Sequence, residues 1–263
     1  MASADERGGT QPTGADARAA ARALIDLVRK QHLPKRFRRE PPWHSVAAAF
    51  VVWMADTVES ILTLWDGKDA LGSENDLDMI ILLRSLYEQT VVFAWLAIDP
   101  QAHMKQWGEN ERYYHRVLVE EAAEYGIPCT YEEVTTKGNR LKPMDQLARA
   151  VDEHWGGVLT GFRTAAAKRR KQQIDLLTFA GLYLPIYREA STATHATPVS
   201  LTPYMDLDAS PRVVRVGFGQ NYAAWWSMVV PIYTQALIVC NSVLKWPDKQ
   251  TVLDINNSMY PGG

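Results

Sequence analysis

An arginine, a serine and a histidine within the stretch Tyr187–His195 have the spacing of residues that share one face of a helix. Arg188 is followed by Ser191 after three positions and by His195 after seven, and both offsets bring side chains together on a helix. An arginine holds a phosphate or carboxylate through its fixed fork of donors, and an imidazole exchanges a proton near neutral pH. The spacing therefore predicts either a small phosphoryl-transfer site or a buried polar cluster that ties two helices together.

A run of four basic residues lies upstream of this stretch. It consists of Lys168, Arg169, Arg170 and Lys171. Such a run is typical of a solvated helix end, but it leads into the helix that carries Arg188, so we also consider it as a substrate-binding patch for phosphate. The net charge of the chain is only -2. Any contact with nucleic acid must therefore come from a local patch rather than from the charge of the whole molecule.

Charged residues also interrupt two long apolar segments. Arg84 and Glu88 lie one helical turn apart among apolar neighbours, which predicts a structural polar pair, because a buried charge is tolerated only when it is paired. A role in a site is the alternative. Asp56 and Glu59 share a helix face, but the Glu-x-x-His companion found in di-metal bundles is missing. We expect those two carboxylates to form a solvated or arginine-paired edge.

Other motifs with known chemistry are missing from the sequence. It contains no Gly-rich phosphate loop, no G-x-S-x-G and no H-E-x-x-H, so the usual nucleotide, serine-hydrolase and zinc-protease signatures are absent. Cys129 and Cys240 are far apart and fit neither a zinc site nor a disulfide framework. We therefore expect no metal and no cofactor. The first 20 residues show no signal peptide, and we expect a cytoplasmic protein.

The elements that position these residues are expected to be helices. Apolar periodicity, punctuated by proline and glycine, predicts an all-α fold with one helical-bundle domain over residues 15–250. A disordered tail is expected over residues 1–14 and a C-terminal tail over residues 251–263. The expected helices cover residues 15–32, 43–65, 76–98, 100–125, 144–155, 173–196 and 219–245.

Two of these segments have special features. Pro185 should kink the helix over residues 173–196, and a long proline-containing loop then precedes the last helix, with a short alternating segment at residues 212–216. Residues 223–244 carry no charged side chain and are long enough to cross a bilayer. Because they include Pro231 and several polar residues, we expect a buried helix and no stable membrane insertion.

The segment Leu83–Glu88, the stretch Tyr187–His195 and the apolar last helix together resemble a bacterial all-helical family of unknown function, number 5677. The resemblance covers about residues 45–245. It implies a single helical domain in which one helix bears an Arg-Glu pair and another bears a Ser-x-x-x-His. The family name implies no activity.

Arg188 and His195, with six residues between them, also resemble the Arg-x(4 to 6)-His motif of HEPN (higher eukaryotes and prokaryotes nucleotide-binding) domains. Many HEPN domains are metal-independent ribonucleases with an active site formed across a homodimer. The resemblance implies RNA as a partner, His195 as the base that activates the ribose 2′-hydroxyl and Arg188 as the group that stabilises phosphate charge. Ser191 would be a hydrogen-bond partner. The function expected from it is an endoribonuclease that acts as a toxin or in phage defence.

A non-catalytic function is the alternative from a different class. The chain could be an interaction module, or it could bind a small ligand in an aromatic-lined pocket. In that case the cluster of Arg188, Ser191 and His195 would be structural. Nine tryptophans and eleven tyrosines supply enough aromatic surface for both a core and such a pocket.

Overall fold

The computed structural model describes most of the chain. The described residues are 13–30, 42–71, 76–126, 138–170, 173–188, 190–191, 205–206, 213–214, 228–246 and 248–260. His195, Lys171, Cys129 and residues 1–12 of the expected N-terminal tail lie outside them.

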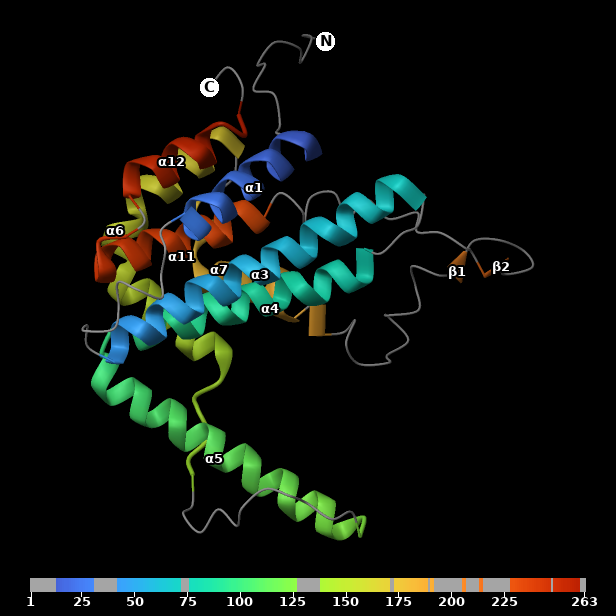
Figure 1. Ribbon diagram of the computed structural model, residues 1–263, viewed down its shortest axis with the longest axis vertical. Coiled ribbons are helices and arrows are strands. Elements are labelled where there is room, and N and C mark those ends of the chain that lie inside the picture. The colour runs from blue at the N-terminus through green and yellow to red at the C-terminus, as the bar shows by residue number, and fades with distance from the viewer. Residues whose placement is uncertain are drawn as a thin grey trace, which may run out of the picture.

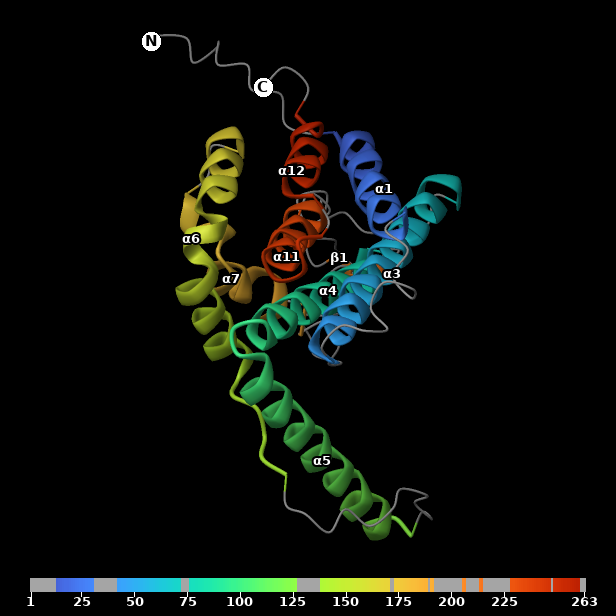
Figure 2. The same cartoon turned by 60° about the vertical axis from the view of Figure 1, so that its left-hand side comes forward.

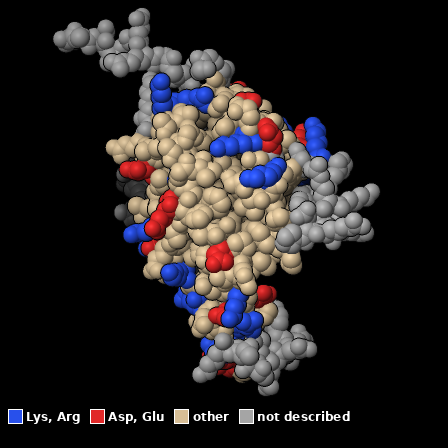
Figure 3. Space-filling view, turned by 90° about the vertical axis from the view of Figure 1, so that its left-hand side faces the viewer, with Lys and Arg blue, Asp and Glu red and all other residues tan. Residues whose placement is uncertain are grey.

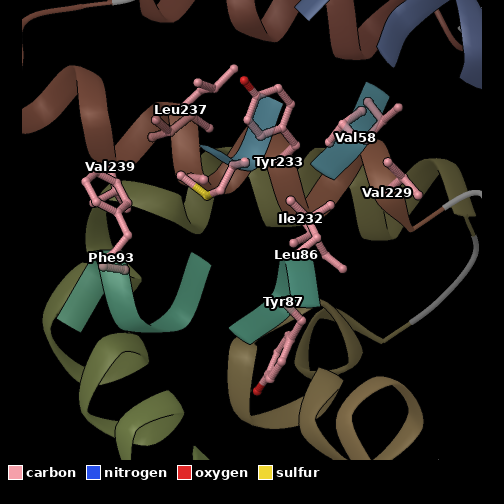
Figure 4. Close-up of a cluster of buried hydrophobic side chains, with 14 of the residues drawn as sticks. Val58, Leu86, Tyr87, Phe93, Val229, Ile232, Tyr233, Leu237 and Val239 are labelled. Carbon is pink, nitrogen blue, oxygen red and sulfur yellow. The ribbon is translucent and has the colours of Figure 1, made fainter. Parts of the chain in front are cut away.

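Three apolar helices form the centre of the fold (Figures 1 and 2): α3 (Pro42–Leu71), α4 (Asp76–Leu96) and α11 (Val229–Leu244). Every residue of α11 from Val229 to Cys240 is buried, which explains why its sequence is apolar on all sides. Figure 4 shows Leu86 and Phe93 of α4 pointing toward α11, whereas Tyr87 points to the opposite side. Helix α4 therefore has one face in the main core and another toward the segment that carries Tyr187.

Three further helices cover this centre. Helix α1 (Gly14–Lys30) packs against α3 with its apolar stripe, and α12 (Lys249–Asn257) lies against α1 and α11. Helix α6 (Met144–Arg170) crosses the end of α4 that leads into α5 (Figure 2). It buries Leu147, Val151 and Leu159. In the face shown in Figure 3, the middle is largely uncharged, with basic side chains above it and an acidic side chain below it.

Helix α5 (Pro100–Glu124) extends away from the other helices (Figures 1 and 2). Its start is well defined, because the Asp99 side chain accepts a hydrogen bond from the Ala102 amide and Pro100 occupies the first turn. None of its residues is buried. Charges of both signs lie along it at the bottom of Figure 3. Only its first half contributes to the site described below.

The chain after α6 is broken into short pieces. A 3₁₀ turn, η2 (Ile174–Leu177), is followed by α7 (Phe179–Leu182) and by a wide turn of π type, η3 (Tyr183–Arg188). Farther along, β1 (Met205–Asp206) pairs antiparallel with β2 (Val213–Val214). The second strand lies within the alternating segment expected at residues 212–216.

The all-α prediction is confirmed, and most of the helices lie close to the expected ranges. The end expected at residue 65 for the helix over residues 43–65 is wrong, because α3 continues to Leu71. Arg18 and Arg22 of α1 both form salt bridges with Asp66, which tie this part of α3 to α1. The end expected for α6 at Trp155 is also wrong. Its buried stripe continues through Leu159, and this burial offsets the cost of Gly156 and Gly157 inside a helix.

The structure differs from two further expectations about the second half of the chain. The sequence predicts one kinked helix over residues 173–196, but Thr178 starts a new helix by accepting a hydrogen bond from the Gly181 amide. Pro185 lacks an amide hydrogen, and the backbone around it widens into η3. At the other end, the expected tail over residues 251–263 contains most of α12, and Val252 and Met259 are fully buried. The packed part of the chain therefore extends to Tyr260.

Candidate functional site

A pocket of about 480 Å³ opens where α3, α4 and the first half of α5 meet η3 and the segment that precedes α6. We call it the Glu88 pocket. Its walls come from residues far apart in the sequence, from Phe50 on α3 to Tyr187 on η3. The volume lies within the range of sites that hold small molecules.

Aromatic side chains form much of the wall. The ring of Phe50 is buried, and its centroid lies 5.7 Å from that of Trp53 and 5.5 Å from that of Trp107. Trp53 is 53% exposed and Tyr114 is 47% exposed. Large exposed aromatic side chains around a pocket are available to contact a ligand, since their own helices do not bury them. Tyr187 completes this group from η3.

Glu88 is the carboxyl group of the pocket and is partly buried on α4. Burial raises the pKa of Glu88, and the nearby positive charge of Arg84 has a smaller effect in the opposite direction. The two residues predicted as a polar pair are thus electrostatically coupled, but the loss of water has the larger effect on the carboxyl. Glu88 therefore retains its proton to a higher pH than an ordinary glutamate.

Neighbouring polar groups on α3 and α4 hold the wall of the pocket in place. Gln89 donates a hydrogen bond from Nε2 to Oγ1 of Thr57 over 3.0 Å, and the Thr57 hydroxyl lies 3.1 Å from the carbonyl oxygen of Trp53. This connection fixes the distance between the two helices beside the pocket. The position of Glu88 relative to Trp53 is therefore set by buried contacts.

The segment before α6 is held against α5. The Leu141 amide donates to Oδ1 of Asn110 over 2.9 Å. A Cβ atom on Gly138 would lie 2.1 Å from the carbonyl oxygen of Glu109, so this close approach requires glycine. The segment brings two exposed cationic side chains, Arg140 and Lys142, to the pocket.

Tyr187 joins the two stretches of the sequence that carry the candidate motifs, Leu83–Glu88 and Tyr187–His195. The Arg84 guanidinium carbon lies 4.7 Å from the centroid of the Tyr187 ring, a cation-π distance. Tyr87 lies 6.2 Å from the same ring and Tyr183 stacks on it at 5.3 Å. The structure therefore brings the segment Leu83–Glu88 and the start of the Tyr187–His195 stretch together at one pocket.

A buried ionic network holds the start of α7, the short helix that leads into η3. Asp152 accepts hydrogen bonds from Arg163 over 2.7 Å and from the Phe179 and Ala180 amides over 3.0 Å and 2.8 Å. The Nε of Arg163 donates to Gln235 on α11 over 2.7 Å. Burial lowers the pKa of Arg163, and the adjacent Asp152 opposes this effect. The network fixes the start of α7 and, through it, the turn that presents Tyr187.

A second bond to this short helix comes from α4. The Tyr87 hydroxyl donates to the Phe179 carbonyl oxygen over 2.6 Å. Sequence reasoning missed Asp152 and Arg163, because the helix was expected to end at Trp155. If the expected helix had continued past Trp155, the spacing of eleven residues between Asp152 and Arg163 would have placed both on one face of α6.

The residues of the predicted phosphoryl-transfer site are only partly within the described chain. Arg188 lies at the end of η3 and is exposed. The Ser191 hydroxyl donates to the carbonyl oxygen of Tyr187 over 2.5 Å. His195 lies outside the described residues. The exposure of Arg188 does not fit the alternative in which its side chain belongs to a buried cluster.

The basic run lies at the end of α6, beside the C-terminal segment. Arg169 donates to Asn257, and its guanidinium carbon lies 5.5 Å from the centroid of the Tyr260 ring. Arg170 donates from Nε to the Tyr260 hydroxyl over 2.9 Å. Lys168 is exposed, and Lys171 lies outside the described residues. Both arginines therefore hold the C-terminal segment, a role that the sequence did not indicate.

The expected arginine-paired edge on α3 is confirmed. Arg29 of α1 forms a salt bridge with Glu59 and lies 3.9 Å from Asp56. Within the part of the chain that the structure describes, no group of three or more His, Cys, Asp and Glu residues is placed to hold a metal ion. Cys240 is buried in α11, and burial raises the pKa of its thiol.

Comparison with known proteins adds a family but no activity. Residues 44–211, well over half of the chain, match the profile of a family of unknown function (DUF5677). This range includes every residue that lines the pocket. No curated protein and no solved structure matches the chain.

Proposed function

Because the chain belongs to a family of unknown function (DUF5677), we propose its function from geometry: the protein binds a small molecule in the Glu88 pocket. One observation carries this proposal. A pocket of about 480 Å³ combines aromatic walls with a partly buried carboxyl group. Apolar and aromatic walls with a few convergent polar groups are the usual composition of small-molecule sites, and groups with shifted pKa values gather at such sites.

The placement of the sequence motifs supports the proposal. Ser85 and Glu88, from the apolar helix α4, and Tyr187, from η3, all line the same pocket. The partial burial of Glu88 costs free energy that the nearby Arg84 offsets only in part. A bound ligand with a hydrogen-bond donor would offset the remainder.

A variant that fills the pocket tests the proposal. We expect benzyl alcohol, a neutral aromatic probe, to give saturation-transfer NMR signals with the parent protein and none with Ser85→Phe. Ser60→Phe is the matched control, because Ser60 is an exposed residue of α3 outside the pocket. Thermal melts of the three proteins report whether each variant is folded. Equal probe binding by folded Ser85→Phe and by the parent would contradict the proposal.

A second candidate function is a metal-independent endoribonuclease. The exposure of Arg188 favours it, because an arginine that serves only a buried network would not face solvent. In this proposal Arg188 stabilises the phosphate charge and His195 activates the 2′-hydroxyl. Ser191 assists as a hydrogen-bond partner, and two copies form the site as a homodimer. Such an enzyme would act as a toxin or in phage defence.

The nuclease candidate is tested with purified protein and mixed cellular RNA in the presence of EDTA. We expect the parent to cleave RNA, and we expect cleavage to fall at least about a hundredfold in Arg188→Ala and His195→Ala, the scale of one lost general-base or charge-stabilising group. Arg149→Ala, at an exposed position of α6, is the charge-matched control. Light scattering reports the oligomeric state. Intact RNA at high protein concentration, with no difference in toxicity between the parent and His195→Ala on expression, would reject this candidate.

A further inference from the structure

We infer that the Glu88 pocket selects a zwitterionic ligand, with a protonated amine at one end, an acidic group at the other and a flat apolar body between them. This inference rests on the proposed binding function and adds the chemical class of the ligand. It is carried by the charges that line the pocket: one carboxyl among the aromatic walls and two cations on the segment before α6.

The amine end follows from Glu88 and its aromatic neighbours. Trp53 and Trp107 line the same pocket as the carboxyl. A cation is attracted by the faces of aromatic rings and by a carboxylate, and both attractions strengthen where water is partly excluded. A protonated amine at this place would also replace the water that Glu88 has lost by burial.

The acidic end follows from Arg140 and Lys142. Both side chains are exposed and line the pocket from a segment whose backbone is held against α5. The planar guanidinium binds a carboxylate or phosphate through two parallel hydrogen bonds, and the lysine adds a second positive charge. Since the contacts at Gly138 and Leu141 fix the segment, the two cations do not have to be ordered from a free chain when the ligand binds.

The two kinds of charge together determine the selectivity. A ligand with only a positive group would gain from Glu88 but be repelled by Arg140 and Lys142. A ligand with only a negative group would gain from the two cations but be repelled by ionised Glu88. A neutral aromatic ligand would gain from the walls alone. The zwitterion is the class that all three sets of side chains favour.

Four probes with one aromatic ring test the inference: 4-(aminomethyl)benzoate, benzylamine, benzoate and benzyl alcohol. They differ only in their end groups. We expect 4-(aminomethyl)benzoate to bind about tenfold or more tightly than benzylamine or benzoate, as judged by dissociation constants from NMR titration, since a charged hydrogen bond has an effect of this size. Weaker or equal binding of the zwitterion would overturn the inference.

Variants assign each end of the ligand. Glu88→Gln should remove the advantage conferred by the amine, and the double variant Arg140→Ala, Lys142→Ala should remove the advantage conferred by the acid. Glu153→Gln and Arg149→Ala are the matched controls, since both residues are exposed on α6 and neither lines the pocket. Retention of the full preference in both pocket variants would also overturn the inference.

The failure of this inference can be distinguished from the failure of the proposed function. If all four probes bind equally and Ser85→Phe abolishes their binding, the pocket binds ligands without the inferred charge selectivity. If Ser85→Phe leaves the binding of all four unchanged, the pocket is not the binding site and both proposals fail.

Discussion

Two carboxylates, Glu88 and Asp152, show how side chains with the same chemistry acquire different roles. Asp152 accepts hydrogen bonds from Arg163 and from two backbone amides, which makes it a structural anchor. For Glu88, burial outweighs the favourable effect of Arg84. An acid that burial destabilises and that lines a pocket is suited to meet a ligand, whereas an acid with its bonds satisfied inside the protein is suited to hold the fold.

Glu88 should make the stability of the protein depend on pH. Its pKa is raised from the ordinary value of 4.5, so the folded state holds a proton that the unfolded chain releases earlier. The free energy of unfolding should therefore fall as the pH rises from about 4.5 through the folded-state pKa of Glu88 and stay lower above it. Glu88→Gln cannot lose a proton and should lack this part of the decline, as measured by urea denaturation at a series of pH values.

Several other groups line the same pocket as Glu88 or act on its carboxyl, and they remain unchanged in this comparison. They are Arg84 on α4, Tyr114 on α5, Tyr187 on η3, and Arg140 and Lys142 before α6. The difference between the parent and the variant therefore isolates Glu88. Glu153→Gln should follow the parent. Parallel curves for the parent and Glu88→Gln would show that burial does not shift this carboxyl.

The Asp152 anchor gives a second prediction at the scale of single residues. Asp152→Ala leaves the guanidinium of Arg163, whose side chain is only 4% exposed, without this carboxylate. It should lower the free energy of unfolding by roughly 3–5 kcal/mol. The double variant Asp152→Ala, Arg163→Met should lose less than the sum of the two single variants. Exposed Glu153→Ala should change stability by no more than about 0.5 kcal/mol. Additive losses in chemical denaturation would contradict a direct coupling.

At the scale of elements, the sequence predicted helices well where local signals and packing agree. Asp99 and Pro100 mark the start of α5 in the sequence, and the structure uses them as the cap and the first turn. Gly156 and Gly157 suggested the end of α6, but burial of Phe162 and its neighbours continues the helix to Arg170. A local rule fails there because long-range packing contributes more free energy than the preference of two glycines.

Two glycines in different surroundings, Gly157 and Gly138, lead to opposite predictions for a change to alanine. A Cβ on Gly157 would meet nothing within 4 Å, so Gly157→Ala should raise the free energy of unfolding by about 0.5–1 kcal/mol through the helix preference of alanine. Gly138→Ala would place its Cβ 2.5 Å from the Tyr113 amide nitrogen. It should force the segment away from α5 and weaken probe binding in the Glu88 pocket. Chemical denaturation measures the expected gain in stability of Gly157→Ala, and NMR titration measures the expected loss of probe binding in Gly138→Ala.

At the scale of the whole molecule, the fold class could be predicted from the sequence but the pocket could not. Apolar periodicity reports which face of a helix is buried, and this was enough for an all-α fold. The pocket depends on how α3, α4, α5 and η3 approach one another, and helix spacing within one segment contains no information about that approach. The residue types around Glu88 and Tyr187 mark both stretches in the sequence. That the two stretches line one pocket could be seen only in the tertiary structure.

The apolar composition of the central helices fits both a membrane span and a buried core helix. By length and composition, residues 42–67 of α3 and 78–96 of α4 could each cross a membrane. Helix α11 has 16 residues and is shorter than a typical membrane span. In the most apolar 18-residue stretch of each helix, 56% of the residues in α3 and 67% of those in α4 are buried inside the protein. Core helices of large helical proteins have the same composition.

The uneven packing of the molecule predicts uneven protection from hydrogen exchange. Residues 229–240 of α11 are all buried, whereas none of the residues of α5 is buried. Amide groups in α11 and in the buried part of α4 should therefore exchange last, through global unfolding, and those in the second half of α5 should exchange first, through local opening. Addition of 4-(aminomethyl)benzoate should slow exchange around Trp107 and Tyr114, which line the pocket, and leave the end of α5 near Glu124 unchanged. Mass spectrometry of peptides from α4, α5 and α11 measures this pattern. Equal protection of the end of α5 and of α11 would mean that another surface covers the extended helix in solution.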